Sequence, residues 1–212
     1  LAIDGKTLRG TIPAGQMRGR HLLAAYLANE GVVLRQIEVP DKDGELSAAP
    51  ELLEAIDLRG KIVTGDALFA QRHISRQVME QGGRYVWRVK DNQPRLKEDI
   101  KTLFEPELLL PGFSAALTDF RTATQLSTGH GRIERRTLTV SHELKGYLDW
   151  PGAEQVFKLE RHVTRQSDGK ETLETVYGIT SLSPKQASPR RLLTIIRSHW
   201  SIENGLFYRR DH

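Results

Sequence analysis

The amino-acid sequence predicts an α/β protein, with a mixed sheet flanked by helices and a mostly β segment inserted before the last helix. Two observations support this class. Between Lys61 and Phe104, short strand-like runs alternate with helical runs, which is typical of layered α/β proteins. From about residue 112 to residue 183, strand-like runs follow one another and are separated by Gly, Pro and Asp-Gly. We therefore expect residues 1–111 to form the first part of a core, 112–183 an inserted β-rich segment and 184–212 the last core helix.

Three strands are expected at the N-terminal end. Leu1–Ile3 is a short apolar run that leads directly into Asp4. The runs His21–Ala28 and Val32–Val39 flank Asn29-Glu30-Gly31, and an Asn and a Gly between two apolar runs indicate a hairpin. The N-terminal segment therefore contributes three consecutive strands.

Helices and strands alternate through the next segment. Ser47 is a favourable N-cap for a helix that stops before Gly60. The β-branched run Ile62-Val63-Thr64 suits a central strand, and it delivers Asp66 at its C-terminal end. In chain order, the expected elements are a helix from Ser47 to about Leu58, a strand at Lys61–Gly65, a helix at Gln71–Gln81, a strand at Tyr85–Lys90 and a helix at Arg95–Phe104.

The inserted segment carries runs of β-type composition at Arg135–Ser141, Gln155–Thr164 and Glu171–Thr180. The last two flank Ser167-Asp168-Gly169-Lys170, which is a hairpin signal. After a linker, a final helix is expected from Arg190 to about Arg210.

Composition excludes several classes of site. The chain has 212 residues and no cysteine, so it holds no disulfide, no thiolate metal site and no cysteine nucleophile. No apolar run approaches the roughly 20 residues that a membrane-spanning helix requires, so no membrane partner is expected. The net charge is only +4, but the segment from Pro189 to Arg210 holds five arginines and one acid. Such a cluster suits phosphate groups, although a solvated helix face explains it as well.

The last predicted helix carries a carboxylate on its apolar face. Helical periodicity places six residues within one stripe that should face the sheet. An inward carboxylate is costly unless it is paired or bound to a metal ion. Arg210 or His199 could pair with Glu203 on this face, so the stripe alone leaves both explanations open. The six residues are Leu192, Ile196, His199, Glu203, Leu206 and Arg210.

Two further carboxylates, Asp4 and Asp66, each follow a short apolar strand. Ligands of open α/β sheets bind beyond the carboxyl ends of the strands. If the two strands are parallel neighbours, these carboxylates lie side by side, and with Glu203 they form an oxygen site for a pair of Mg²⁺ ions. Taken singly, each Asp is better explained as a turn or helix-cap residue, and only the three carboxylates together favour a metal site.

Five segments in this order resemble the DDE transposases of bacterial insertion sequences, most closely the H-repeat-associated type. They are Ile3-Asp4-Gly5-Lys6, Gly65-Asp66-Ala67-Leu68-Phe69, Val89-Lys90-Asp91-Asn92-Gln93-Pro94, His130-Gly131-Arg132-Ile133-Glu134 and His199-Trp200-Ser201-Ile202-Glu203-Asn204. The resemblance covers essentially the whole chain.

The resemblance implies an RNase H-like core with Asp4, Asp66 and Glu203 as catalytic, metal-binding residues. It implies two Mg²⁺ or Mn²⁺ ions, cleavage and transfer of DNA strands at insertion-sequence ends, and a bacterial cytoplasmic, nucleoid-associated location. The partners are double-stranded transposon-end and target DNA, and the complex with DNA allows a homodimer. Because family members are longer at both ends, this chain is expected to be a catalytic core. A truncated, inactive remnant that at most binds DNA is the alternative.

Basic residues near these motifs are candidates for contacts with DNA phosphates. They are Lys6, Arg132 and Arg210, with Arg132 in the turn that follows His130. A plain surface hairpin explains Arg132 equally well. Trp87 and Trp200 could stack on an unpaired base, but their places beside apolar positions favour packing in the core.

Overall fold

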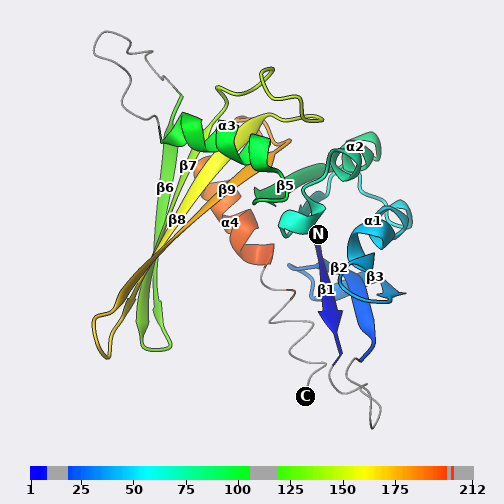
Figure 1. Ribbon diagram of the computed structural model, residues 1–212, viewed down its shortest axis with the longest axis horizontal. Coiled ribbons are helices and arrows are strands. Elements are labelled where there is room, and N and C mark those ends of the chain that lie inside the picture. Colours follow the sequence, from blue (N-terminus) through cyan, green and yellow to red (C-terminus); the bar gives the residue numbers. More distant parts are fainter. Residues whose placement is uncertain (9–18, 106–118, 200–201, 203–212) are drawn as a thin grey trace. The chain divides into compact units, whose positions relative to one another are not determined.

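The computed structural model describes residues 1–8, 19–105, 119–199 and 202 (Figure 1). The chain divides into two compact units, one comprising residues 1–87 and 194–212 and the other residues 88–193. Strands and helices alternate along the chain, and a large mixed sheet is flanked by helices. The predicted α/β class is therefore confirmed. No helix within these described ranges is long and apolar enough to cross a membrane.

The sheet of the first unit has the strand order β3-β2-β1-β4-β5. The antiparallel pairs β1–β2 and β2–β3 form the N-terminal part, whereas β1–β4 and β4–β5 are parallel. The three predicted N-terminal strands are confirmed, although β1 continues well past Asp4 because β2 pairs with it as far as Thr7. The strands are β1 (Ala2–Thr7), β2 (His21–Leu27), β3 (Val32–Val39), β4 (Ile62–Gly65) and β5 (Arg84–Val89).

The helices of this unit are α1 (Gly44–Glu54), the short 3-10 helix η2 (Ala67–Phe69) and α2 (Arg72–Glu80). The prediction that Ser47 caps the first helix is wrong. The Asp41 carboxylate accepts a hydrogen bond from the Gly44 amide at 3.1 Å, and this turn starts the helix one turn earlier. Ser47 therefore lies inside α1, and the helix ends at Glu54 rather than near Leu58.

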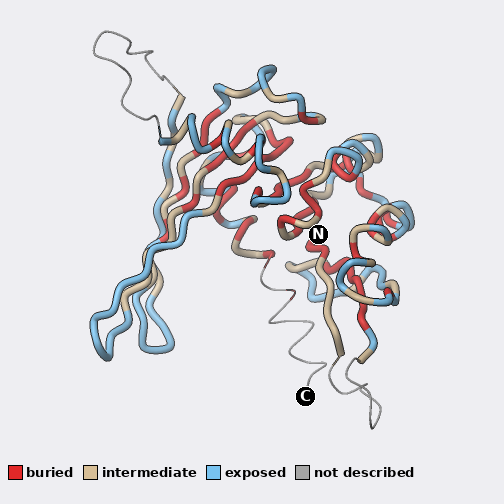
Figure 2. The backbone as a smooth tube through the Cα atoms, viewed as in Figure 1, coloured by how far each residue is buried: buried red, intermediate tan, exposed pale blue. Residues whose placement is uncertain are grey.

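The core of the first unit is built on the inner residues of β1, β2, β4 and β5 (Figure 2). Trp87 on β5 is fully buried and stacks on Tyr85, with ring centroids 5.6 Å apart. Its indole N–H donates to the Ser75 hydroxyl of α2 at 3.0 Å. Packing in the core is thus confirmed for Trp87, and its ring is not available to stack on a base.

The second unit contains α3 (Pro94–Phe104) and four antiparallel strands in the order β9-β8-β7-β6. The strands are β6 (Arg121–Gly129), β7 (Arg132–Ser141), β8 (Gln155–Arg165) and β9 (Glu171–Thr180). The last three coincide with predicted runs, whereas β6 was not predicted. The chain then enters α4 (Pro189–His199).

Strands β7, β8 and β9 of the second unit are buried at one end and more exposed at the other, whereas β6 has no buried residue (Figure 2). Leu138, Val140, Phe157 and Leu159 are buried on β7 and β8. Farther along the same strands, the side chains are exposed, and β6 and β7 meet at the turn His130-Gly131, where both residues have positive φ. The exposed ends therefore form a two-hairpin arm, which we define as residues 126–135 and 162–173.

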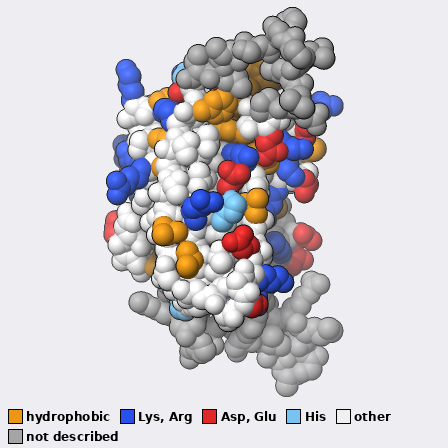
Figure 3. Space-filling model, turned by 90° about the vertical axis from the view of Figure 1, so that its left-hand side faces the viewer, with side chains coloured by type: hydrophobic (Ala, Val, Ile, Leu, Met, Phe, Trp, Pro, Cys, Tyr) orange, Lys and Arg blue, Asp and Glu red, His pale blue; other side chains and the backbone are white. Residues whose placement is uncertain are grey.

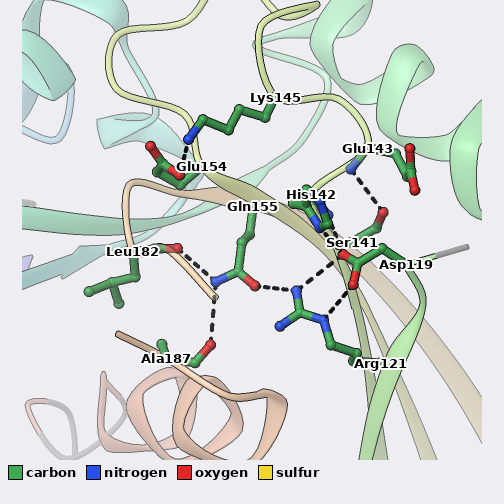
Figure 4. Close-up of polar contacts among 10 residues, drawn as sticks. All are labelled: Asp119, Arg121, Ser141, His142, Glu143, Lys145, Glu154, Gln155, Leu182 and Ala187. Atoms are coloured by element: carbon green, nitrogen blue, oxygen red, sulfur yellow. Dashed lines mark hydrogen bonds and ion pairs between the residues drawn. The ribbon is translucent and has the colours of Figure 1, made fainter. Parts of the chain in front are cut away.

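A buried glutamine connects the sheet of the second unit to the segment that precedes α4 (Figure 4). The Gln155 amide donates to the carbonyl oxygens of Leu182 at 2.7 Å and Ala187 at 3.3 Å. Its oxygen accepts from the Arg121 guanidinium at 2.7 Å, and Arg121 also pairs with Asp119. This network fixes the path of the chain into the last helix.

Candidate active site

Two of the predicted site residues, Asp4 and Asp66, belong to neighbouring parallel segments of the sheet. In the parallel pair β1–β4, Ala2 is in register with Thr64. Asp4 follows Ala2 by two residues within β1, and Asp66 follows Thr64 by two residues, directly after the end of β4 and at the start of η2. Since paired strands lie about 4.8 Å apart, this register carries both aspartates to the same edge of the parallel pair. The parallel pairing that the sequence analysis required is therefore present, whereas the expectation that the first strand ends at Asp4 is wrong, because Asp4 lies inside β1.

The backbone around Asp66 is tightly held. Its carboxylate accepts a hydrogen bond from the Leu68 amide at 2.8 Å and caps η2. A Cβ atom at Gly65 would lie 2.9 Å from the Phe69 ring and 3.0 Å from the Trp87 ring, so a larger residue does not fit there. The Asp4 carboxylate accepts from the amide of Gly5 at 2.9 Å. Both carboxylates are half-buried and held by local hydrogen bonds.

The last helix packs on the face that carries these carboxylates. His199 is buried, and its Nδ1 lies 3.1 Å from the Thr64 hydroxyl. Ile202 is fully buried against Ala2 and Tyr26. Side chains two residues apart share a face of an extended strand, so Ala2 and Asp4 point to the same face of β1. His199 and Ile202 contact Thr64 and Ala2 and therefore lie over that face.

The predicted apolar stripe of this helix is confirmed as far as the structure describes it. Leu192, Ile196 and His199 are buried. Glu203, Arg210 and Trp200 lie outside the described residues. Among the described side chains, no three His, Asp or Glu residues lie close enough to hold a metal ion.

The two remaining candidates for DNA contacts belong to different units. Lys6 is half-buried on β1, two residues after Asp4 on the same face. Arg132 is exposed at the base of the β6–β7 turn, directly opposite Arg165 on β8. With His130 and Lys170, these arginines line a hollow of about 390 Å³ at the end of the arm.

One buried polar cluster near the carboxylates was not predicted. It lies on the opposite face of β1. His21 of β2 shares one hydrogen bond with the Thr7 hydroxyl through Nδ1 and a second with the Glu45 carboxylate of α1 through Nε2, at 2.7 Å and 2.6 Å. Burial raises the pKa of Glu45, the His21 hydrogen bond counteracts this, and the nearby charge of Asp66 adds to the rise. His21 and Glu45 are 24 residues apart, and no periodic pattern links them.

Comparison with known proteins identifies the family of this chain. The sequence profile described as Transposase DDE domain matches residues 1–206. The chain belongs to the transposase DDE domain family. The predicted resemblance is thereby confirmed.

Curated relatives of this transposase domain include two proteins of Escherichia coli (strain K12). The chain is 33% identical to "Putative protein YbfL", with 100% of this chain and 55% of that protein covered. It is 32% identical to "H repeat-associated putative transposase YhhI", with the same coverage. The "Uncharacterized protein in dhlA 3'region" of Xanthobacter autotrophicus is 33% identical over 85% of this chain and 59% of its own length. The chain thus spans about half the length of the curated relatives it matches.

One solved structure superposes on part of the chain at low similarity. Streptomyces venezuelae DesVI superposes with a TM-score of 0.27 and 12% identity over 63% of this chain and 48% of its own. A similarity at that level does not support an assignment of fold or function.

Proposed function

We propose that this chain is the catalytic part of a DDE transposase, which cleaves DNA strands and transfers them at the ends of an insertion sequence. The observation that supports the proposal is the parallel register of β1 and β4, in which Ala2 pairs with Thr64, two residues before Asp4 and Asp66 respectively. An RNase H-like core in which residues 112–183 form an insertion is the architecture that we propose with it. Such a protein acts on double-stranded DNA in the bacterial cytoplasm, and a homodimer in the DNA complex stays a prediction.

Glu203 is the third carboxylate of the proposed site. His199 and Ile202 support this assignment, because both pack over the face that carries Asp4 and Asp66. Glu203 follows His199 by four residues and Ile202 by one. Side chains four residues apart share one face of an α-helix.

The donor set fits hard divalent cations. Asp4 and Asp66 offer carboxylate oxygens at one level of the sheet, and oxygen ligands are those that Mg²⁺ and Mn²⁺ prefer. When bound, a pair of such ions activates a water or hydroxyl nucleophile and stabilises the leaving oxygen. The protein's own contribution is orientation: the amides of Leu68 and Gly5 hold the two carboxylates in place.

DNA contacts are proposed at Lys6, Arg132 and Arg210. Lys6 shares the face of β1 with Asp4, where a scissile phosphate must approach. Arg132 stands with Arg165 at the end of the arm, and guanidinium groups bind phosphates well. The face drawn in Figure 3 mixes basic, acidic and hydrophobic side chains, so we assign the contacts to individual cations. Arg132→Ala should weaken DNA binding. It should also reduce the slope of the logarithm of the binding constant against the logarithm of the salt concentration by about one, since one fewer counterion is released.

The experiment is a strand-cleavage assay on DNA that carries the insertion-sequence ends, with and without Mg²⁺ or Mn²⁺. Asp4→Asn and Asp66→Asn should each lower the rate about 10³-fold, because each removes a ligand worth several kcal/mol in the transition state. Asp57→Asn is the matched control, since Asp57 is an exposed aspartate of the same unit that pairs with Arg59. Cleavage that survives in both site variants would overturn the assignment. DNA binding without cleavage by the wild-type chain would favour the inactive remnant.

A further inference from the structure

The back of strand β1 carries a buried polar contact that the proposed chemistry does not use. We propose that His21 and Glu45 are positioning residues, which hold β1 so that Asp4 can bind a divalent cation. This inference rests on the proposed function. It concerns the face of the sheet opposite to Asp4.

The contact is short and shielded from water. Glu45 is 3% exposed and His21 is 7% exposed, and their side chains lie 2.6 Å apart. The other ring nitrogen of His21 lies 2.7 Å from the Thr7 hydroxyl. A continuous hydrogen-bonded chain therefore runs from α1 through β2 to the end of β1.

Gly5 shows how closely Glu45 approaches β1. A Cβ atom at position 5 would lie 2.0 Å from one Glu45 carboxylate oxygen and 2.8 Å from the other. The carboxylate thus rests against the backbone of the residue that follows Asp4. Any side chain at position 5 would push Glu45 away from His21.

The alternation of side chains along β1 connects this cluster to Asp4. Gly5 and Thr7 point to the α1 face, whereas Asp4 and Lys6 point to the opposite face. Glu45 and His21 hold the strand at residues 5 and 7, and these two anchor points fix the backbone that orients Asp4. On its other edge, β1 has no β4 partner at this level, since β4 ends at Gly65.

Stability alone is a poor reason for burying these groups. A buried charged pair is often no better for stability than apolar residues of similar size. A hydrogen-bonded pair fixes geometry more narrowly than apolar packing does, and outer partners of metal ligands set ligand orientation. A positioning role accounts for a buried glutamate on an otherwise apolar helix face.

The test measures Mn²⁺ affinity by isothermal titration calorimetry, with urea unfolding of each variant in parallel. Glu45→Ala and Gly5→Ala should each weaken affinity about tenfold. The variant that combines Glu45→Ala with Gly5→Ala should bind Mn²⁺ no more weakly than either single variant, because both changes remove the same contact. Glu45→Gln keeps a side chain that can bond to His21 and should restore affinity to within about twofold of wild type. Glu51→Ala, an exposed glutamate on the same helix, is the matched control.

Three results would overturn the inference. Wild-type affinity in Glu45→Ala, where Asp66→Asn abolishes binding, refutes the positioning role and leaves the proposed function intact. Complete loss of binding in both Glu45→Ala and Glu45→Gln makes Glu45 a ligand instead. Absence of Mn²⁺ binding in the wild-type chain removes the proposed function and this inference with it.

Discussion

Replacing Thr64 by valine tests whether the last helix is held against the strand that leads to Asp66. The Thr64 hydroxyl lies 3.1 Å from His199 Nδ1, and the two residues are 5% and 7% exposed. Valine has nearly the same shape as threonine, so the change leaves no cavity and removes the hydroxyl alone. A change in stability therefore reports the polar contact between β4 and α4.

The magnitude follows from burial. A neutral hydrogen bond contributes about 0.5–1.5 kcal/mol net, and a desolvated partner raises the cost of losing it. We expect Thr64→Val to lower the free energy of unfolding by about 1–2 kcal/mol. The cleavage rate should fall further, by about 10–100-fold, because the proposed ligand Glu203 follows His199 by four residues in the sequence and small displacements of catalytic groups are expensive.

Urea unfolding and single-turnover cleavage measure the two effects. Thr124→Val is the matched control: Thr124 is exposed on β6 and its hydroxyl lies 3.2 Å from that of Thr137. That variant should stay within about 0.5 kcal/mol of wild type. If Thr64→Val is as stable and as active as the control, the contact does not hold the helix, and the reasoning fails.

Three further predictions concern the second unit. Gln155→Leu should lower the free energy of unfolding in urea by about 3 kcal/mol, because the Leu182 carbonyl and the Arg121 guanidinium both lose their hydrogen bond to the Gln155 amide. Gly178→Ala should lower the free energy of unfolding by about 1–3 kcal/mol, since a Cβ atom there would lie 2.0 Å from the buried Phe157 ring. The Tyr177 hydroxyl donates to Glu105 at 2.6 Å and lowers the pKa of that carboxyl. The resulting stabilisation is complete above the ordinary value of 4.5 and is lost as pH falls through the lowered pKa, so Tyr177→Phe should flatten the acid limb of a stability–pH curve.

Each of these changes has a control at an exposed position. Gln125→Leu and Gly129→Ala alter the same residue types on β6, where nothing lies within 4 Å of an added Cβ at Gly129. Tyr147→Phe removes a hydroxyl from a tyrosine that is 70% exposed. A test variant that unfolds at the same urea concentration as its control, or an acid limb that Tyr177→Phe leaves unchanged, would contradict the corresponding prediction.

Local patterns in the sequence predicted the parts of the fold that depend on neighbouring residues. Strand β4 follows from a short β-branched run between two glycines, whereas its parallel pairing with β1 entered the sequence analysis only as a condition, because strand order is not a local property. The burial of Ile196 and His199 follows from helical periodicity. Strand β6 was not predicted because its sequence, RTATQLSTG, is mostly polar and shows no apolar alternation. It forms a strand by pairing with β7, and the sequence does not show that pairing.

Other features depend on contacts between distant residues. The helix α1 starts early because the Asp41 side chain closes a turn on Gly44, a hydrogen bond that competes with the cap expected at Ser47. The contact of His21 with Glu45 exists only because α1 packs across β2. Pattern and spacing carry no information on such pairs.

The central claim is that Asp4, Asp66 and Glu203 share one cation site. Iron-mediated backbone cleavage tests it most directly: Fe²⁺ replaces Mg²⁺, and ascorbate with peroxide cuts the chain next to the bound metal. We expect cuts near all three residues, and we expect excess Mg²⁺ to suppress them together and Asp66→Asn to abolish them together. Cuts confined to another acidic segment, such as residues 41–45, or cuts near Asp4 and Asp66 without one near Glu203, would contradict it.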